Sequence, residues 1–413
     1  MKITAIETMR PAHHSNVVFV RLHASDGLIG LGEAFYDAAA VEAYLHHSLA
    51  PALFALADAT PEWAATALGT YVGYQGSGVE TRARGAVDVA LWDLLGRRSG
   101  QPVSRLLGGP VRTAIPIYNT CAGSGYVSRT SRQESGNWGL DPAAAYDDLN
   151  AFLTRPGALA KELRDEGIPG MKIWPFDRAA ERTGGHDIGR DDLAAGVATV
   201  AAIRDAVGLD VDVMIELHGL WQRRAAQKIC DALAPYQVAW VEDPMRADAV
   251  DALAALAAAV DVPIALGETC VGRRGFLPLL DRGVVDVVTC DPQWTGGLTE
   301  ARKVAALADA YGVAVAPHDC TGPVTFAACC HLSMSQPNAT VQETVRAFLR
   351  TWYADLVTGL PVVADGVVRV SDAPGLGVDL REDAIARMAV RRSDAPTHTT
   401  AVRQPNSRAP LAT

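Results

Sequence analysis

Eight short apolar segments recur along the chain, and this repetition constrains the fold more than any other feature of the sequence. Alanine-rich stretches with helical spacing separate most of them. Parallel strands need crossover connections of a dozen or more residues, and helices usually supply them. Eight such units over residues 114–350 match the size of a (β/α)₈ barrel. The segments are AIPIYN, GMKIW, VDVMIE, QVAWVE, VPIALGE, VVDVVTCD, VAVAPH and ATVQE.

Two regions flank the predicted barrel. Residues 1–113 show short alternating runs and then a helical pattern, which predicts a small α+β unit. Residues 351–390 contain strand-like runs with Gly and Pro turn signals. Residues 391–413 are polar and mildly basic, which predicts a flexible tail. The expected class is therefore α/β, with a (β/α)7–8 TIM-like barrel as the catalytic domain.

Composition and charge exclude several classes of protein. With 49% hydrophobic and 20% charged residues among 413, the chain can bury a large core. A net charge of −10 without a basic stripe argues against a nucleic-acid partner. We find no apolar run long enough to span a membrane and no secretory signal pattern. Seven irregularly spaced cysteines without CxxC are typical of reduced thiols in a cytoplasmic enzyme.

Ionisable residues end six of the predicted strands. Successive ones are 26, 26, 23, 27 and 25 residues apart, which is about the length of one βα unit. Strand ends gather in a ring at the C-terminal face of a barrel, so we expect these side chains to converge on one mouth. The six are Glu216, Glu242, Glu268, Asp291, His318 and Glu343.

Three of these residues form a predicted metal site. Glu216, Glu242 and Glu268 would repel one another in a partly dry mouth unless a divalent cation lay between them. Oxygen-only ligands favour Mg²⁺, with Mn²⁺ as a substitute, over Zn²⁺. Three protein ligands leave positions for water and for a substrate carboxylate. The cation would then stabilise the charge that develops when the α-carbon loses its proton.

Two histidines are candidates for proton transfer. A carboxylate such as Asp291 beside His318 raises the basicity of the imidazole, which predicts a general base. His218 lies two residues after Glu216, and strand alternation places both on the same side. His218 is either a general acid aimed at a leaving group, or a fourth metal ligand or a loop histidine with satisfied hydrogen bonds.

Other residues near the predicted mouth are candidates for substrate binding. Lys172, in the second segment, either stabilises an anion or pairs with a carboxylate. Asn119 and Trp174 end the first two segments, and we include both as substrate-binding candidates. His13 and His14 reach over the mouth as part of a specificity loop, or they are plain surface histidines.

A polar insertion follows the first predicted strand. Residues 122–141 are rich in Gly, Ser and Arg, and their position places them on the same face as the strand ends. The insertion is either a lid or a surface loop.

Several motifs resemble the enolase superfamily, in the branch of mandelate racemase and muconate lactonizing enzyme. The resemblance covers about residues 1–385. It implies that residues 1–113 are an N-terminal α+β capping domain, which residues 351–390 return to and complete. The motifs that carry it are ARGAVDVALWDLLGRRSGQPVSRLLGG, VEDP, GE, Asp291 with GGLT, and PGLG.

The resemblance also implies roles for the strand-end residues. The three glutamates would be the metal ligands, His318 with Asp291 the basic dyad, and Glu343 a hydrogen-bond partner of the substrate carboxylate. The sequence departs from the family at two positions. Glu216 stands where Asp is more frequent, and Trp174 stands where the second Lys of a Lys-x-Lys pair often acts as a base. A racemase needs groups on both faces of its substrate, so simple racemisation is disfavoured.

The segments ELHG, PH, GP and QE are most similar to the galactonate-type acid-sugar dehydratases, in which a strand-three histidine assists departure of the β-hydroxyl. We therefore expect Mg²⁺-dependent dehydration of a small carboxylate, a sugar acid, to a 2-keto-3-deoxy acid. A cycloisomerase or an epimerase or racemase acting through the same enolate is the alternative. A barrel that binds a ligand without turnover is disfavoured by the intact set of ionisable residues. Barrels of this kind commonly assemble, so we expect a homo-oligomer.

Overall fold

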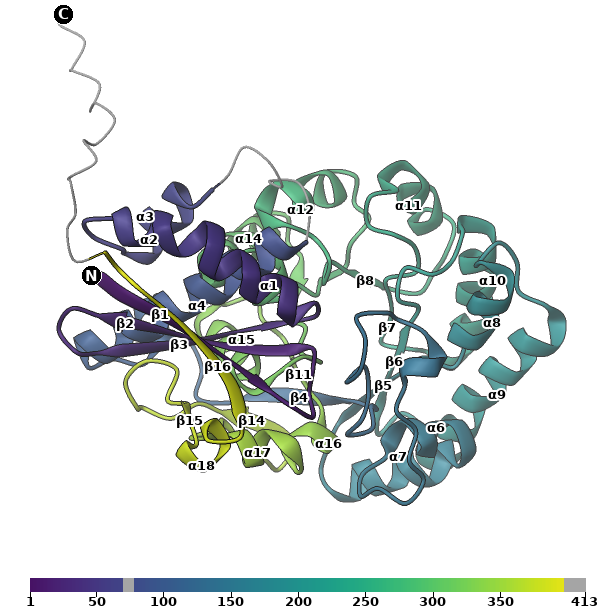
Figure 1. The fold of residues 1–413 in the computed structure, drawn as a ribbon. Coiled ribbons are helices and arrows are strands. Elements are labelled where there is room, and N and C mark those ends of the chain that lie inside the picture. Colours follow the sequence, from purple (N-terminus) through teal and green to yellow (C-terminus); the bar gives the residue numbers. More distant parts are fainter. Residues whose placement is uncertain (70–77, 397–413) are drawn as a thin grey trace, which may run out of the picture.

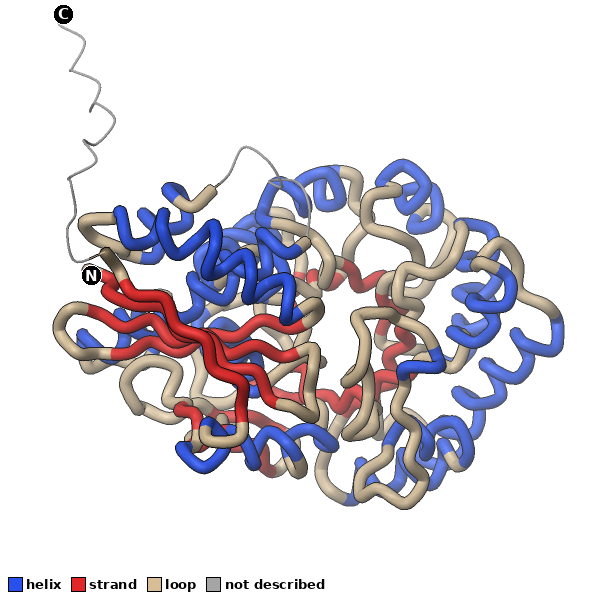
Figure 2. Tube along the Cα trace, in the orientation of Figure 1, coloured by secondary structure: helices blue, strands red, loops and turns tan. Residues whose placement is uncertain are grey.

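The computed structural model describes residues 1–69 and 78–396 of the chain. Its N-terminal unit is a four-stranded antiparallel sheet in the order β16-β1-β2-β3, with helices packed on one face (Figures 1 and 2). The strands are β1 (Ile3–Pro11), β2 (Val17–Ala24), β3 (Ile29–Phe35) and β16 (Met388–Asp394), and the helical segments are α1 (Ala38–Tyr44), the π-helix η1 (Leu45–Leu49), α2 (Ala50–Ala55), α3 (Pro61–Ala67) and α4 (Val79–Ser99).

Helix α4 packs directly on strand β3. Gly30 and Gly32 make this close approach feasible, because a Cβ at either residue would lie about 2 Å from a backbone carbonyl oxygen of α4. The absence of side chains at these two positions therefore sets the spacing between sheet and helix.

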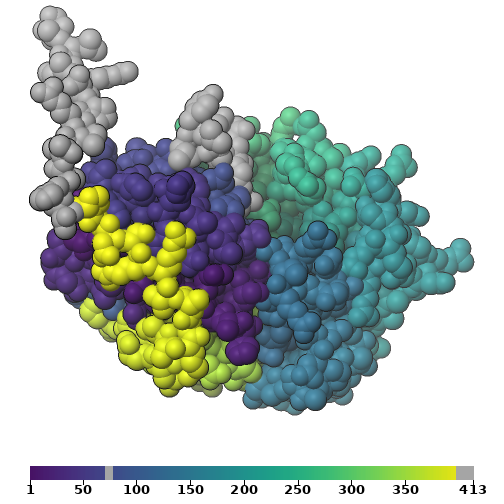
Figure 3. Space-filling model, in the orientation of Figure 1, coloured from purple at the N-terminus to yellow at the C-terminus, as the bar shows by residue number. Residues whose placement is uncertain are grey.

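The C-terminal strand corrects one prediction. Residues 391–394 belong to β16 and pair with β1 in antiparallel register, from Pro11↔Met388 to Ala5↔Asp394, so they are not part of a flexible tail. Their polarity misled the prediction, because β16 lies at the edge of the sheet with most of its side chains exposed. Figure 3 shows this C-terminal surface, in yellow, lying on the purple N-terminal unit. The remainder of the predicted tail, 397–413, lies outside the described residues.

The barrel has eight parallel strands in the described part of the chain. Seven follow the order β10-β9-β8-β7-β6-β5-β4, and β11 pairs with β4 on the other side. A parallel bridge between Val315 and Ala339 spans the remaining gap. Each predicted segment overlaps one strand, with β4 and β11 running one residue further than predicted, so the predicted barrel is confirmed. The strands are β4 (Ile115–Thr120), β5 (Gly170–Ile173), β6 (Asp212–Glu216), β7 (Trp240–Glu242), β8 (Ile264–Leu266), β9 (Val287–Val288), β10 (Ala314–Val315) and β11 (Gln342–Thr344).

Helices surround this ring of strands (Figure 2). Helix α15 is buried along its whole length, because it packs against the barrel on one side and strand β3 on the other. The helical segments are α5 (Val103–Leu106), η2 (Ser135–Asn137), α6 (Asp148–Thr154), α7 (Pro156–Asp165), α8 (Asp177–Thr183), α9 (Arg190–Val207), α10 (Arg223–Leu233), η3 (Ala234–Tyr236), α11 (Val250–Ala257), α12 (Gly272–Asp281), α13 (Pro292–Thr295), α14 (Leu298–Ala310), α15 (Pro323–Ser335), α16 (Arg346–Leu349), α17 (Trp352–Leu356) and α18 (Glu382–Ile385).

Four short strands lie outside these two sheets or at their edge. They are β12 (Val357–Thr358), β13 (Val362–Ala364), β14 (Val367–Arg369) and β15 (Asp379–Leu380). The hairpin of β13 and β14 adds to the barrel strand β4 in antiparallel direction. Within the described residues, the helices are too short or too polar to cross a membrane.

A separate apolar cluster fills the inside of the barrel. Its buried members are Tyr118, Met214, Trp240, Ala265 and Ala316. The barrel is thus a packed core and not a pore, which leaves its C-terminal mouth as the place for polar chemistry.

Candidate active site

Three glutamates from neighbouring strands meet at the mouth of the barrel. Glu216 and Glu242 are the last residues of β6 and β7, and Glu268 follows the end of β8 by two residues. One carboxylate oxygen from each lies within 4.8 Å of the other two. Asp291 and His318 lie three residues beyond the ends of β9 and β10. The prediction that these two residues end their strands is therefore wrong, although both lie on the same face of the barrel. Strands β8 to β10 are two or three residues long, and the polar residues lie in the loops beyond them.

Lys172, on strand β5, lies between the carboxylates. Its Nζ is 3.0 Å from Glu242 Oε1, 3.0 Å from Glu343 Oε1 and 3.5 Å from Glu216 Oε2. Burial lowers the pKa of Lys172, but the charges of Glu242 and Glu343 outweigh it and raise that pKa above its ordinary value. Burial also raises the pKa of Glu242, to about 8. The lysine therefore stays charged and compensates part of a crowded negative site.

The three glutamates fit a hard divalent cation. All their donor atoms are oxygens, and hard cations prefer such ligands. Glu216 Oε2 is buried and accepts no hydrogen bond from the described residues, and its one ion-pair partner there, Lys172 Nζ, is 3.5 Å away and closer to two other carboxylates. A buried carboxylate oxygen without a hydrogen-bond donor is costly, and a cation would compensate it. The three carboxylates are thus placed so that they could hold a metal ion, and the Mg²⁺ itself stays a prediction.

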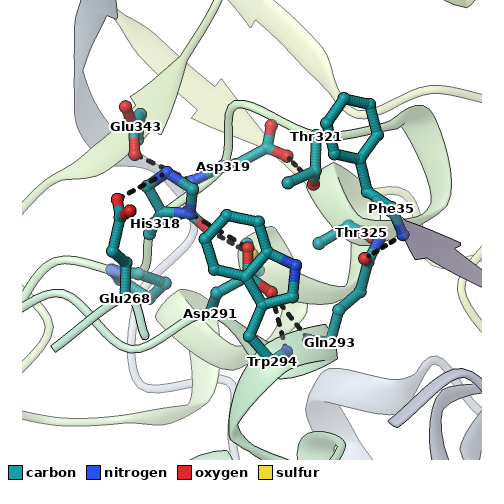
Figure 4. A network of polar contacts seen from close by, with 12 residues as sticks. Phe35, Glu268, Asp291, Gln293, Trp294, His318, Asp319, Thr321, Thr325 and Glu343 are labelled. Carbon is teal, nitrogen blue, oxygen red and sulfur yellow. Dashed lines mark hydrogen bonds and ion pairs between the residues drawn. The ribbon is translucent and has the colours of Figure 1, made fainter. Parts of the chain in front are cut away.

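His318 lies between two carboxylates. Its Nδ1 is 3.0 Å from Asp291 Oδ2, and its Nε2 is 3.1 Å from Glu268 Oε2 (Figure 4). Burial lowers the pKa of His318, but the charges of Glu268 and Glu343 outweigh this effect, so the pKa is raised. Asp291 is itself fixed, because its Oδ1 accepts from the backbone N–H groups of Gln293 and Trp294. The imidazole is therefore held with Nε2 facing the mouth.

Glu343 is held by several donors. Its Oε2 accepts from the backbone N–H of Asp319 at 2.8 Å, and its Oε1 accepts from the hydroxyl of Thr120 as well as contacting Lys172. Burial raises its pKa, but Lys172 and His318 outweigh burial and lower the pKa to about 2. Glu343 is thus an ionised carboxylate in this arrangement.

His218 is paired with a second carboxylate that the sequence analysis did not identify. Its Nδ1 lies 2.8 Å from Asp177 Oδ2, at the start of α8. The backbone of His218 has a positive φ of 50°, and its N–H donates to Glu216 Oε1 at 2.6 Å. Strand β6 ends at Glu216, so a left-handed turn, and not strand alternation, places the imidazole.

The insertion at residues 122–141 supplies two side chains to the same cavity. Gln133 Nε2 lies 3.2 Å from His218 Nε2, and the hydroxyl of Tyr126 lies 3.5 Å from it. Trp174, a predicted substrate-binding residue, also lines this cavity. The insertion therefore contributes to the mouth of the barrel.

Three predicted substrate-binding residues do not line this cavity. Asn119 points outward, where its Nδ2 donates to Asp148 at 2.9 Å and its Oδ1 accepts from the backbone N–H of Arg346. His13 is exposed, and His14 stacks on Trp352 with ring centroids 4.2 Å apart. Strand β4 continues to Thr120, so alternation directs Thr120, and not Asn119, into the mouth.

Several residues at the cavity were missed by the sequence analysis. A search that extended a few residues past each strand would have found Thr120, Asp177, Trp294 and Cys320. Tyr36 follows β3 of the N-terminal unit, and no local signal links it to the barrel. The missed lining residues are Tyr36, Thr120, Tyr126, Gln133, Trp294 and Cys320.

Two family models match successive parts of the chain. The model for the N-terminal domain of mandelate racemase and muconate lactonizing enzyme matches residues 3–108, and the model for enolase C-terminal domain-like proteins matches residues 157–384. The chain belongs to the enolase superfamily. This confirms the predicted superfamily, and with it the combination of a barrel and an N-terminal domain.

Curated and solved members of the enolase superfamily extend this result. A D-galactonate dehydratase of Ralstonia nicotianae is 32% identical over 92% of this chain and 93% of its own. A D-gluconate dehydratase of Thermoproteus tenax is 31% identical over 76% of this chain and 57% of its own. A solved enolase of the mandelate racemase subgroup from Agrobacterium tumefaciens is 41% identical, with a TM-score of 0.84 over 96% of this chain and 99% of its own. The predicted relationship to acid-sugar dehydratases is confirmed.

Proposed function

We propose that this enolase-superfamily enzyme dehydrates a sugar acid to a 2-keto-3-deoxy acid. One observation carries the proposal: two histidine–carboxylate pairs, His318 with Asp291 and His218 with Asp177, converge on one carboxylate-lined cavity. Loss of water from a 2,3-dihydroxy acid needs one base and one acid, and these pairs supply both. The dehydratase names of the relatives support the same reaction.

The base acts first in this proposal. His318 Nε2 takes the proton from C2, and the electron pair of the C–H bond moves toward the substrate carboxylate. Lys172 faces that developing charge with its ammonium group. Mg²⁺ bound by Glu216, Glu242 and Glu268, or Mn²⁺ in its place, would offset the charge further.

The acid completes the reaction. His218 Nε2 gives its proton to the hydroxyl at C3, the C3–O bond breaks and water leaves. The resulting enol then tautomerises to the 2-keto-3-deoxy acid. Glu343 was expected to hydrogen-bond the substrate carboxylate. As an ionised group bound to Lys172, it is better suited to orient the lysine.

A single-base arrangement favours dehydration over racemisation. The family position of a second lysine base is Trp174, whose ring is buried and packs edge-on to the His218 ring at 5.8 Å. An indole cannot abstract a proton. Cycloisomerisation and epimerisation share the first step, so they remain the outcomes that an experiment must separate.

The test is a screen of acid sugars with Mg²⁺, including D-galactonate and D-gluconate, for formation of 2-keto-3-deoxy acids. We expect turnover of at least one acid, and about 10²–10⁴-fold less with His318→Asn. Hydrogen exchange at C2 without loss of water would establish an isomerase instead. Binding without exchange across the library would indicate a barrel that only binds its ligand.

A further inference from the structure

The insertion at residues 122–141 is fixed to both parts of the molecule. On the N-terminal side, Asn16 Nδ2 donates to the carbonyl oxygens of Val127 at 2.5 Å and Thr130 at 2.8 Å. On the barrel side, the hydroxyl of Ser135 donates to Glu181 Oε2, in α8, at 2.6 Å. The backbone of the insertion therefore has a defined place above the strand ends.

Contacts within the insertion and to helix α8 hold it as a compact unit. Trp138 is buried and lies under the guanidinium of Arg178, whose Cζ is 5.1 Å from the ring centroid. Asn137 Nδ2 donates to the carbonyl oxygens of Thr130 at 2.8 Å and Arg132 at 3.0 Å. A polar segment held by such contacts presents its remaining side chains in fixed positions.

Two of those side chains point at the proposed acid. Gln133 Nε2 donates to the hydroxyl of Tyr126 at 2.5 Å and lies 3.2 Å from His218 Nε2. The Tyr126 ring packs on Trp174 with centroids 5.1 Å apart, which directs its hydroxyl toward His218. The nitrogen that would give its proton to the leaving group thus has an amide and a phenol beside it.

The chemistry of these two groups specifies what they bind. A primary amide offers two donors and an acceptor, and a phenol offers one donor and an acceptor. A hydroxyl group within reach of His218 Nε2 can accept its proton and still bond to both neighbours. An apolar β-substituent at that place would leave the buried phenol of Tyr126 and the half-buried amide of Gln133 bonded only to each other and to His218, with donor and acceptor capacity unused, which is disfavoured.

We propose that Tyr126 and Gln133 are specificity-determining residues that hydrogen-bond the hydroxyl groups at C3 and C4 of a sugar acid. This inference rests on the proposed dehydration. It also gives a reason for the contacts of the insertion with Asn16 and Glu181. These contacts hold Tyr126 and Gln133 at a fixed distance from His218, which the enzyme needs in order to distinguish one epimer from another.

The experiment compares two C4 epimers, D-galactonate and D-gluconate, with the Mg²⁺-loaded full-length enzyme. Tyr126→Phe removes one oxygen, and Gln133→Met keeps the length of the side chain without its amide. We expect kcat/KM for the better epimer to fall about 10- to 100-fold and the ratio between epimers to change at least about 5-fold. Arg132→Ala, at an exposed neighbour on the same insertion, should leave the ratio unchanged.

A second measurement separates specificity from damage to the base. A 3,4-dideoxy sugar acid has no hydroxyl at C3 or C4, so exchange of its C2 hydrogen in D₂O should be unaltered in both variants. An active wild type with an unchanged epimer ratio in both variants would overturn this inference alone. A wild type that forms no keto acid from any sugar acid would overturn the proposed function as well. If Gln133→Met does not fold, the epimer ratio of Tyr126→Phe alone tests this inference.

Discussion

Asp177 holds His218 by its Nδ1, with 2.8 Å between the carboxylate oxygen and the ring nitrogen. Burial lowers the pKa of His218, but the charges of Asp177 and Glu216 outweigh burial and raise the pKa to about 9. The imidazole is thus protonated near neutral pH, as a general acid must be before it acts. His318 also has a carboxylate partner, Asp291, and because its pKa is raised too, His318 must lose the proton on Nε2 before it can act as the proposed base.

Replacement of His218, the proposed acid, should uncouple removal of the C2 proton from loss of water. His218→Asn is expected to lower keto-acid formation by about 10²–10⁴-fold while His318 still removes the C2 proton. Proton NMR in D₂O would follow exchange at C2 and product together. Loss of both exchange and product would instead indicate that His218 maintains the metal site. His13→Asn, at an exposed histidine outside the cavity, is the control.

Replacement of His318, the proposed base, should slow both removal of the C2 proton and loss of water. His318→Asn keeps a polar side chain of similar reach but removes the proton acceptor. We expect C2 exchange and turnover to fall together by about 10²–10⁴-fold. A loss of less than tenfold would rule out His318 as the base. Mg²⁺ affinity of the variant, measured by calorimetry, shows whether the site remains intact.

The metal site can be tested without turnover. Glu242→Gln keeps the shape of the side chain and removes one charged ligand, so Mg²⁺ binding and activity should be lost together. Titration calorimetry and the rise in melting temperature on adding Mg²⁺ both report binding. Glu62→Gln, at a surface ion pair with Arg302 and Lys303, is the matched control. Undiminished Mg²⁺ affinity in Glu242→Gln would remove Glu242 from the site.

A buried aspartate of the N-terminal unit predicts a pH dependence of stability. Asp88 Oδ1 accepts from the backbone N–H of Thr299 at 3.0 Å, and Oδ2 has no hydrogen-bond partner among the described residues. Burial raises the pKa of Asp88 to about 7 from 3.8. Between these values the folded state keeps a proton that the unfolded state releases. The contribution of Asp88 to stability therefore falls as pH rises to about 7 and is constant above.

Asp88→Asn should remove the part of the stability loss at rising pH that comes from Asp88. The free energy of unfolding of the variant minus that of wild type should therefore become more positive by on the order of 2 kcal/mol from pH 5 to pH 8. Urea unfolding at both pH values measures it, with Asp205→Asn at an exposed position as control. Parallel pH profiles for Asp88→Asn and wild type would contradict the assignment.

Much of this architecture was predictable because parallel strands impose a spacing. One βα unit takes about 25 residues. The 26-residue spacing of Glu216, Glu242 and Glu268 therefore predicts that they lie together at the ends of neighbouring strands. The same regularity holds only for side chains within a strand or next to its end. Where β4 runs one residue further than expected, Thr120 takes the place expected for Asn119.

The contacts of the insertion had no local signal. Tyr126 and Gln133 reach His218 because Asn16 and Glu181, far away in the sequence, hold the segment between them. Such tertiary contacts leave no periodicity in the chain. The homo-oligomer stays a prediction, because a single chain does not test it.

The pairing of β16 with β1 has a consequence for synthesis. A ribosome that adds about 5–20 residues per second reaches Asp394 roughly 20 to 80 seconds after Ala5. During that interval one edge of β1 offers unpaired backbone groups, and the whole barrel is synthesised before β16 can cover that edge. Unpaired strand edges recruit other chains. The edge of β1 therefore stays exposed until late in translation, and it is covered only when β16 pairs with it.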